Sequence, residues 1–373
     1  MSQPKPLRFA FVMDQQVGLK TQALNFERVL QDDFPGIDAT FIPVNYAAED
    51  PNPVLRAAEK ALPQSIRGTL AGVREIRQAF ASHAHFDAVL WATWAAKSVP
   101  ELVKAVPSFL VMDMTPTQME TLGERYGYTK SRARFFGGWK RRATDRLYDA
   151  ATHLFPWNNW VAGSLTDDYG VPANKITSVS PGTDTDLFVP DIAQKRSDGV
   201  TRLLFVGGDF ERKGGDLLMR YLRERSASLP PVELHCATRD TVENAPANVH
   251  FYRGIQNNSP ELVRLYQSCD LFVLPTRADC YSLVALEAMA CGLPVVITDM
   301  GGIGDIVADG ETGVLLLEKE DYAALSLTLN GLIAGDVKRE TMGRAARDRA
   351  TALFDCRKSV RTIVAAMGEA SRK

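Results

Sequence analysis

Short apolar segments alternate with longer amphipathic segments along the whole chain. The apolar segments are rich in β-branched residues, leucine and phenylalanine, and the segments between them repeat apolar residues at helical spacing. This alternation is typical of βαβ units, in which helices connect parallel strands. In the first half, strands are predicted at Arg8–Met13, Ala39–Val44, Ala88–Ala92, Phe109–Met112, Thr152–Phe155 and Ile176–Val179.

The second half repeats this pattern after a polar interruption. The segment Pro190–Val200, PDIAQKRSDGV, contains proline and glycine and has no apolar period, which indicates a linker. We therefore predict an α/β protein with two Rossmann-like domains, residues 1–190 and 191–355, and a C-terminal helix, residues 356–373, that packs back towards the first domain. Strands of the second domain are predicted at Arg202–Val206, Val232–Cys236, Val249–Tyr252, Leu271–Leu274, Val295–Thr298 and Val314–Leu317.

The length and charge of the chain limit its partners. Its 373 residues suit two domains of ordinary size. A net charge of -2 and a pI of about 6.3 create no overall field that would attract nucleic acid, so no nucleic-acid partner is expected.

Cysteine usage and hydropathy indicate a reducing compartment. The five cysteines are odd in number and form no CxxC pair, so neither a disulfide framework nor a zinc site is predicted. The first residues lack the apolar core of a signal peptide, and no segment is long and apolar enough for a membrane helix. We expect a cytoplasmic protein that is at most peripheral to the inner face of a membrane.

The segment Pro275–Gly302, PTRADCYSLVALEAMACGLPVVITDMGG, carries the most informative candidate site. We predict a helix at Leu283–Ala290 with Ser282 as its N-cap, which places Asp279 in the loop ahead of the helix and Glu287 inside it. A helix N-terminus after a parallel strand can bind a phosphate, and the two carboxylates can accept hydrogen bonds from sugar or ribose hydroxyls. The alternative is a purely structural strand and helix, with Glu287 in a buried salt bridge.

A second segment, Arg202–Leu222, ends its strand at a glycine pair and continues through a basic loop. Gly207 and Gly208 allow close approach of a ligand, and Arg212 and Lys213 can neutralise a pyrophosphate. The loop matches neither a Walker A loop nor GxGxxG, and its alternative interpretation is a solvated charged turn.

Together the two segments resemble the C-terminal domain of family 4 glycosyltransferases. That family has the GT-B fold, two Rossmann-like domains whose parallel sheets face each other across a cleft. It has an E-x7-E signature in the first kind of loop and helix, and a lysine with a partner arginine in the second. Segments similar to the family at Ser180–Phe188 and Gly301–Leu316 extend the resemblance over roughly residues 150–320.

The resemblance implies roles for the matching residues. Lys213 would bind the donor diphosphate, Glu287 the ribose hydroxyls, and Asp279, which replaces the first glutamate of the signature, the transferred sugar. Arg212 is the candidate to replace the family's phosphate arginine, at whose position this chain has Gly208. The remaining donor-binding candidates are Gly18, Gly208, Gly254, Tyr281, Ser282 and Leu283.

The first domain carries weaker counterparts of the family pattern. Gly18 is predicted to precede a helix, where the family has a glycine loop against the donor phosphates and the acceptor. Many members have a histidine after the fourth strand; here Asp113 lies in that region and is the candidate catalytic residue beside Lys213 and Asp279. The alternative for Asp113 is a polar strand end that caps a helix.

No bound metal and no other cofactor is expected. Asp184-Thr185-Asp186 spells the DxD metal motif of a different glycosyltransferase fold, but its position at the domain exit predicts that Asp184 caps a turn. The five histidines are scattered along the sequence without ligand spacing.

Residues 130–146, KSRARFFGGWKRRATDR, hold seven basic residues against one acidic residue, interleaved with aromatic residues. Such a segment suits weak peripheral contact with an anionic membrane surface. The alternative, favoured by the interrupting glycine pair, is a solvated helix face whose aromatic side chains lie in the core.

The function implied by the resemblance is transfer of a sugar from a nucleoside diphosphate sugar to a hydroxyl acceptor, with retention at the anomeric carbon. The acceptor hydroxyl belongs to a glycan, a lipid-linked compound or a small molecule. The alternatives are a catalytically silent sugar-nucleotide-binding subunit and an epimerase of the GT-B fold.

Overall fold

The computed structural model describes residues 6–83, 85–123, 134–195 and 198–372, which form two compact units. The first unit comprises residues up to Gln118, the stretch that ends at Ser180, and the chain from Arg357 onward. The second comprises Pro181–Cys356 and the stretch that begins at Met119.

The chain enters the second unit about ten residues before the predicted boundary. Phe188 is completely buried there and packs edge-on against Tyr266, with ring centroids 5.7 Å apart. The guanidinium of Arg347 donates to the carbonyl of Phe188 at 2.7 Å. The residues ahead of the predicted linker are therefore part of the second unit's core.

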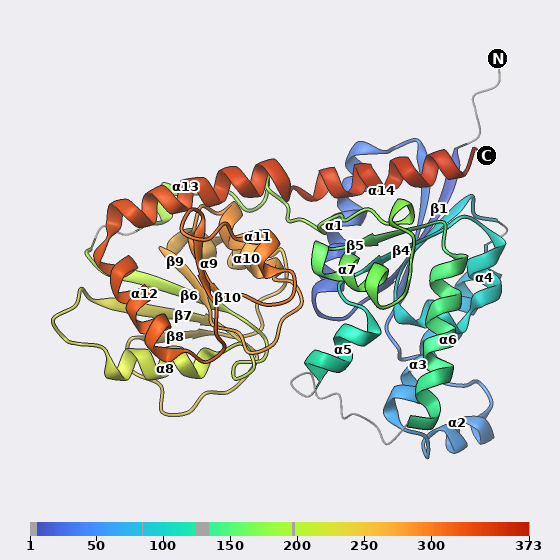
Figure 1. Cartoon of the computed structure of the whole chain (residues 1–373), viewed down its shortest axis with the longest axis horizontal. Helices are drawn as coiled ribbons and strands as arrows, with labels where there is room; N and C mark the ends of the chain where they lie inside the picture. Colours follow the sequence, from blue (N-terminus) through green and yellow to red (C-terminus); the bar gives the residue numbers. More distant parts are fainter. Residues whose placement is uncertain (1–5, 84, 124–133, 196–197, 373) are drawn as a thin grey trace. The chain divides into compact units, whose positions relative to one another are not determined.

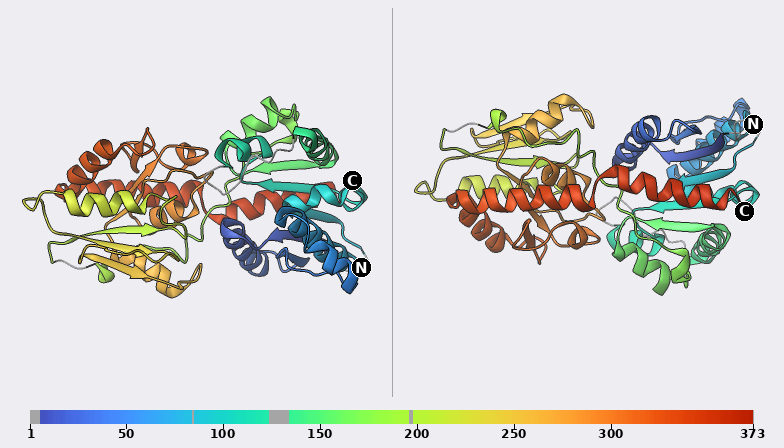
Figure 2. Two further views of the ribbon diagram at one scale, coloured as in Figure 1. Left: turned by 90° about the horizontal axis from the view of Figure 1, so that it is seen from below. Right: turned by 90° about the horizontal axis from the view of Figure 1, so that it is seen from above.

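The first unit is built on a five-stranded parallel sheet with the order β2-β1-β3-β4-β5. Two of its central strands, Ala88–Ala92 and Ser108–Met112, are buried throughout and are apolar apart from Ser108, because helices cover both faces of the sheet (Figures 1 and 2). The strands are β1 (Leu7–Asp14), β2 (Ile37–Val44), β3 (Ala88–Ala92), β4 (Ser108–Met112) and β5 (His153–Pro156).

The second unit is built on a six-stranded parallel sheet with the order β11-β10-β9-β6-β7-β8. Every residue of its two strands β9 and β10 is buried. The strands are β6 (Thr201–Val206), β7 (Val232–Ala237), β8 (Val249–Tyr252), β9 (Leu271–Leu274), β10 (Val295–Thr298) and β11 (Gly313–Leu316).

The helices fill the gaps between the strands, as the alternation predicts. Those of the first unit are α1 (Val17–Asp33), α2 (Pro53–Glu59), α3 (Gln64–Ala81), η1 (Trp94–Ser98), α4 (Pro100–Ala105), α6 (Arg134–Ala150), α7 (Asn159–Asp167) and η3 (Ala173–Lys175). α5 (Pro116–Leu122) runs from the first unit into the second. Those of the second unit are η4 (Ile192–Gln194), α8 (Gly215–Glu224), α9 (Pro260–Ser268), α10 (Leu283–Ala290), α11 (Ile303–Ile306), α12 (Tyr322–Ala334) and α13 (Asp336–Leu353).

The last helix, α14 (Cys356–Ala370), packs on the first unit from Arg357 onward. Arg361 donates to the carboxylate of Asp33 at 2.8 Å, and the hydroxyl of Ser371 donates to the carbonyl of Asp87 at 3.2 Å. None of the described helices is long and apolar enough to cross a membrane.

The predicted strand Ile176–Val179 is wrong. This segment forms only an isolated parallel bridge between Ile176 and Leu154. Thr177 and Val179 donate to β5 carbonyls at 3.0 and 2.8 Å, but these few contacts do not extend into a ladder before the chain turns at Pro181 and Gly182. The apolar pattern correctly indicated that this segment contacts β5, but it predicted more paired residues than the structure has.

All five cysteines are buried as free thiols, and all lie in the second unit. Burial raises the pKa of the Cys269 thiol to about 12 and raises the pKa values of Cys236 and Cys291 further. These side chains behave as small apolar groups in the core.

Candidate donor site

The two segments singled out in the sequence meet at one edge of the second sheet. β6 and β9 are neighbouring parallel strands, so the loops that follow them emerge side by side. The amide of Arg277 donates to the carbonyl of Arg212 at 2.9 Å. Gly214 has a left-handed φ of 80°, and a Cβ there would lie 2.0 Å from the carbonyl oxygen of Pro275. Only glycine permits this close approach of the two loops.

Lys213 and Asp279 form an ion pair across these loops. Both side chains are mostly buried, with 14% and 5% of their surfaces exposed. The amide of Cys280 donates to Oδ1 of Asp279 at 3.1 Å and fixes the carboxylate. Lys213 thereby presents a positioned ammonium group at the C-terminal edge of the sheet, where parallel α/β sheets bind ligands.

The helix α10 begins beside this pair without a side-chain cap. Ser282 is the N-cap residue, as predicted, but its buried hydroxyl has no hydrogen-bond partner among the residues that the structure describes. By contrast, Asn158 and Ser259 cap α7 and α9 with their side chains. The first-turn amides of α10 and the Ser282 hydroxyl therefore remain available to an anionic ligand.

The turn that contains Gly301 closes one side of the α10 N-terminus. The amide of Gly302 donates to the carbonyl of Cys280 at 2.8 Å. Gly301 has a φ of 56°, and a Cβ there would lie 2.8 Å from the same carbonyl oxygen. This turn can pack closely against the Asp279 loop because its two glycines have no side chains.

Glu287 lies inside α10 and is 4% exposed. Burial raises the pKa of its carboxyl to about 7, an effect that a 2.8 Å hydrogen bond from the Tyr266 hydroxyl partly opposes. In the described part of the chain, no basic side chain pairs with Glu287, so the alternative of a buried salt bridge is wrong. A buried carboxyl without a counter-charge is the kind of group that functional sites contain.

Arg212 is already engaged within the loops. Its guanidinium donates to Asp209 at 2.9 Å and to the carbonyl of Ala278 at 2.7 Å. It therefore fixes the two loops to each other, a structural role that the sequence did not predict for it.

Arg239 lies where a side chain at position 208 would project. A Cβ added to Gly208 would lie 2.8 Å from both Nε and Nη2 of Arg239. Arg239 is exposed, follows β7, and makes no hydrogen bond or ion pair with any residue that the structure describes. Sequence reasoning missed it because only the pairing of β6 with β7 brings it over Gly208.

The other donor-binding candidates are distributed around this edge. Tyr281 and Leu283 are buried at the start of α10. Gly254 follows β8 with a φ of 74° and open space beside it. Gly18, in the first unit, lies within the first turn of α1 and not ahead of it, because the helix already begins at Val17 after the extended Gln16.

The first unit has its own polar cluster at the C-terminal edge of its sheet. The hydroxyl of Tyr46 donates to Oδ1 of Asp14 at 2.6 Å and lies 3.0 Å from the hydroxyl of Thr93. Burial raises the pKa of Asp14 to about 6, and the charges of Asp113 and Glu75 raise it as well. The predicted residue Asp113 is thus part of the surroundings of Asp14, which the sequence analysis had not selected.

Asp14 is the last residue of β1, and Thr93 follows β3; the strand order of the first sheet reverses direction between these two strands. Such a point is where open α/β sheets bind ligands. Tyr46 reaches it from a backbone with a left-handed φ of 58°, whose amide donates to the Glu75 carboxylate at 3.1 Å.

The DxD sequence is structural, as predicted. Oδ1 of Asp184 accepts the amides of Asp186 and Leu187, each at 3.1 Å, which is a turn cap. The histidines are less scattered than the sequence suggested, because the register of β7 with β8 places His235 opposite His250.

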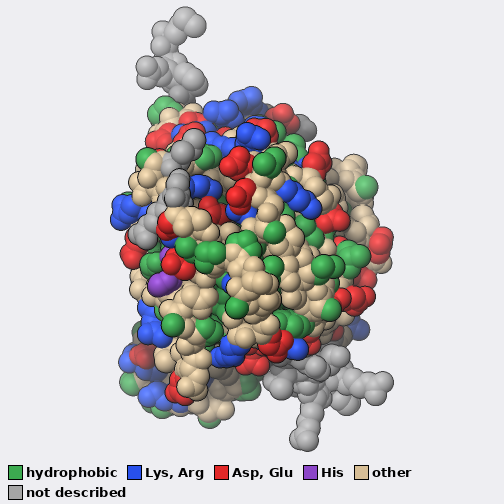
Figure 3. Space-filling model, turned by 90° about the vertical axis from the view of Figure 1, so that its left-hand side faces the viewer, with side chains coloured by type: hydrophobic (Ala, Val, Ile, Leu, Met, Phe, Trp, Pro, Cys, Tyr) green, Lys and Arg blue, Asp and Glu red, His purple; other side chains and the backbone are tan. Residues whose placement is uncertain are grey.

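The basic segment is only partly within the described residues. Residues 130–133 lie outside them, and α6 begins at Arg134. Trp139 is 66% exposed, so the alternative that places the aromatic side chains in the core is wrong for this residue. Lys140, Arg141 and Arg142 beside it are also exposed. On the face of the molecule that Figure 3 displays, by contrast, acidic and basic side chains are interspersed.

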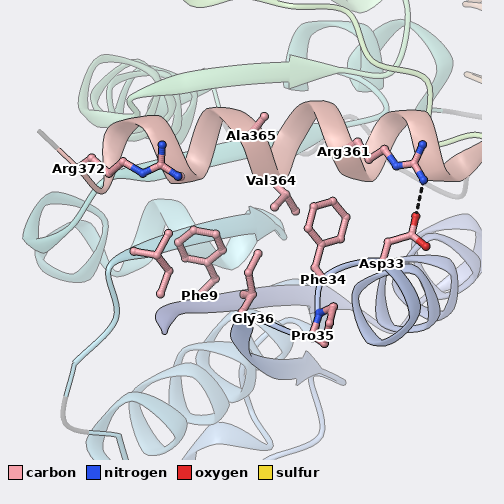
Figure 4. Close-up of a pocket in the computed structure, with 12 residues that line it drawn as sticks. Phe9, Asp33, Phe34, Pro35, Gly36, Arg361, Val364, Ala365 and Arg372 are labelled. Carbon is pink, nitrogen blue, oxygen red and sulfur yellow. Dashed lines mark hydrogen bonds and ion pairs between the residues drawn. The ribbon is translucent and has the colours of Figure 1, made fainter. Parts of the chain in front are cut away.

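A hollow of about 760 Å³ lies in the first unit between α14, the start of β1 and the turn that joins α1 to β2. Figure 4 shows Val364 of α14 facing Phe9 and Phe34, with Arg361 paired to Asp33 at one end. It contains neither the Asp14 cluster nor any predicted site residue.

Residues 200–334 match the protein family described as glycosyl transferases group 1. The matched residues lie within the second unit. The matched segment contains Lys213, Arg239, Asp279 and Glu287.

Two curated relatives are named D-inositol 3-phosphate glycosyltransferase. The one from Corynebacterium aurimucosum is 33% identical over 57% of this chain and 55% of its own length. The one from an Arthrobacter species is 26% identical over 79% of this chain and 73% of its own length. The chain thus spans about half the length of several of the relatives that it matches.

Solved structures with the same fold cover nearly the whole chain. Sucrose-phosphate synthase from Thermosynechococcus elongatus matches with a TM-score of 0.74 and 17% identity over 97% of this chain and 98% of that one. Anabaena Alr3699/HepE, solved with UDP-glucose, matches with a TM-score of 0.69 and 16% identity over 97% and 100%. The fold is GT-B, with one Rossmann-like sheet in each unit, as the resemblance implied.

Proposed function

We propose that the protein transfers a glycosyl unit from a nucleoside diphosphate sugar to a hydroxyl acceptor, with retention at the anomeric carbon. The observation that carries the proposal is the Lys213–Asp279 pair beside the uncapped start of α10 in a group 1 domain. Departure of the diphosphate develops negative charge, which positioned cations and free amides stabilise. Orientation and electrostatics suffice for this chemistry, so we propose no metal cofactor for the transfer.

Each group has a role in this proposal. Lys213 and Arg239 bind the diphosphate, and the Ser282 hydroxyl and the α10 amides bind it from the other side. Asp279 holds the ammonium of Lys213 and contacts the transferred sugar. Glu287 accepts hydrogen bonds from the ribose hydroxyls, which favour its ionised form.

We propose UDP-glucose as the first donor to assay, because HepE was solved with that compound. D-inositol 3-phosphate is the first acceptor to assay, because the curated relatives are named for it. On the acceptor side, Asp14 and Asp113 are the groups that receive hydroxyl hydrogen bonds, since both lie at the C-terminal edge of the first sheet.

The test is calorimetric titration of UDP, GDP and ADP into the wild type and into Lys213→Ala, Arg239→Ala and Glu287→Gln. We expect one nucleotide to bind, and each variant to weaken it by about 1.5–3 kcal/mol, or roughly ten- to 150-fold, because a charged hydrogen bond is lost. Lys338→Ala, which removes an exposed lysine from α13, is the matched control and should bind as the wild type does. If no nucleotide binds, the donor site is wrong.

Turnover separates the enzyme from its alternatives. UDP release in the presence of D-inositol 3-phosphate, with a product whose anomeric proton keeps the donor configuration by NMR, is the expected result. Nucleotide binding without turnover on any hydroxyl acceptor would favour the silent binding subunit, and an inverted product would refute retention.

We also propose that the protein works in the cytoplasm and makes weak peripheral contact with anionic membranes through α6. Support comes from exposed Trp139 beside Lys140 and Arg142, since an aromatic ring flanked by basic residues suits the interface of a bilayer. The test is sedimentation with anionic vesicles at low salt. Trp139→Ser with Arg142→Glu should lose binding, and equal sedimentation of variant and wild type would refute the contact.

A further inference from the structure

Two imidazoles and a carboxylate converge on one face of β7 and β8. His235 on β7 lies directly opposite His250 on β8, and Glu233 precedes His235 by two residues, which puts it on the same face of the strand. One ligand atom from each of the three residues lies within 4.8 Å of the others. The three side chains belong to no part of the proposed donor site.

The spacing of these atoms suits a tetrahedral ion. Nε2 of His235 is 3.5 Å from Oε2 of Glu233, and Nε2 of His250 is 4.0 Å from the same oxygen. Ligands at zinc bond lengths of about 2.05 Å stand about 3.3 Å apart at the corners of a tetrahedron. Small side-chain rotations would bring all three atoms to that separation.

His235 provides a second, independent observation. Its Nε2 is buried and makes no hydrogen bond to any described residue, although it lies 3.5 Å from the carboxylate of Glu233. Its Nδ1 lies 2.8 Å from the hydroxyl of Tyr252. A hydrogen bond on one ring nitrogen orients the other for a metal, which is the usual surrounding of a ligating histidine.

Arg202 is a cation beside Glu233 that could oppose a metal. Its Nε lies 3.3 Å from Oε2 of Glu233, but its other nitrogens bind both oxygens of Asp198, at 3.1 and 2.6 Å. The charge of Arg202 is thus compensated by Asp198. A guanidinium beside a ligating carboxylate then acts as a supporting partner and not as a competitor.

We propose that Glu233, His235 and His250 form a site for a zinc-class divalent cation that joins β7 to the edge strand β8. His250 is 46% exposed on its side chain, so a water molecule completes the fourth position. Imidazole with a carboxylate favours Zn²⁺ and its neighbours in the first transition series over Mg²⁺ or Ca²⁺. The ion is structural, because β8 is at the edge of the sheet and pairs with β7 alone.

The test uses the full chain without a polyhistidine tag, stripped of metal with a chelator. Zn²⁺ titration by calorimetry should give one site per chain, and Co²⁺ should give the visible bands of four-coordinate cobalt. His250→Ala and Glu233→Gln should each weaken Zn²⁺ at least about tenfold, and Tyr252→Phe should weaken it by a smaller but measurable factor.

His85→Ala is the matched control. His85 lies 3.1 Å from the carboxylate of Asp87 but belongs to no group of three possible ligands among the described residues, so its removal should leave Zn²⁺ binding unchanged. Stoichiometric binding that is lost in His250→Ala supports the site. The absence of Zn²⁺ and Co²⁺ binding, or binding that survives in both His250→Ala and Glu233→Gln, overturns it. Titration of UDP into the same protein tests the donor site separately.

Discussion

Glu287 makes the stability of the protein depend on pH in a direction opposite to that of most acidic residues. Its pKa is raised from 4.5 to about 7 because the carboxyl is buried within α10. A buried acid with a raised pKa favours folding below pH 4.5, where it is neutral in both states. This contribution is lost as the pH rises towards 7, because ionisation then costs more in the folded protein.

The magnitude follows from the two pKa values. They differ by about 2.5 pH units, and at 1.36 kcal/mol per unit the ionised group costs about 3 kcal/mol in the folded state. The substitution Glu287→Gln keeps the shape of the side chain and removes the titrating proton. We therefore expect the stability of wild type relative to Glu287→Gln to fall by about 3 kcal/mol between pH 4.5 and 8.

Urea unfolding at half-unit pH steps, followed by far-ultraviolet circular dichroism, measures this difference. Glu340→Gln, an exposed position on α13, is the control and should show little dependence on pH relative to wild type. The quantity compared is the unfolding free energy of wild type minus that of Glu287→Gln. If this difference stays constant across the pH range, the reasoning is refuted. If it rises with pH, a cation near Glu287 stabilises its ionised form in the folded protein.

Two further predictions concern the donor site. Nucleotide binding at pH 7 should release up to about half a proton from Glu287, because hydroxyl donors lower its pKa. Calorimetry in two buffers of different ionisation enthalpy measures the proton release, which should be smaller by that amount in Glu287→Gln. Gly214→Ala should destabilise the protein by about 2 kcal/mol or more in urea unfolding, because the added Cβ would clash with the Pro275 carbonyl. Gly310→Ala is the control, since Gly310 has a similar φ of 74° but open space beside it. It should destabilise the protein by at least about 1 kcal/mol less than Gly214→Ala does.

The alternation of apolar and amphipathic segments was sufficient to predict most of both sheets. It succeeded because buried parallel strands such as β9 need continuous apolar sequence, which few other elements show. It failed at Ile176–Val179, where an apolar segment makes only a bridge. An apolar segment indicates that its residues are buried, but it does not indicate how many of them pair with a neighbouring strand.

Whether a site residue could be predicted depends on whether local sequence or strand order determines its position. Lys213 and Asp279 were identified because each lies in a recognisable local segment, and the structure brings them into contact. Arg239 and Asp14 were missed because their positions depend on which strands are neighbours, and strand order is not written in local sequence. The same holds for His235 and His250, which only the register of β7 with β8 brings together.

The positions of the five thiols allow the opening of the second unit to be measured without an added label site. No cysteine occurs in the first unit, and every one in the second is buried, so a thiol reagent can react only when that unit opens. The labelling rate of the native protein therefore measures the opening of one Rossmann-like unit while the other stays silent. A nucleotide that occupies the second unit would slow this labelling, and no cysteine would have to be engineered to observe it.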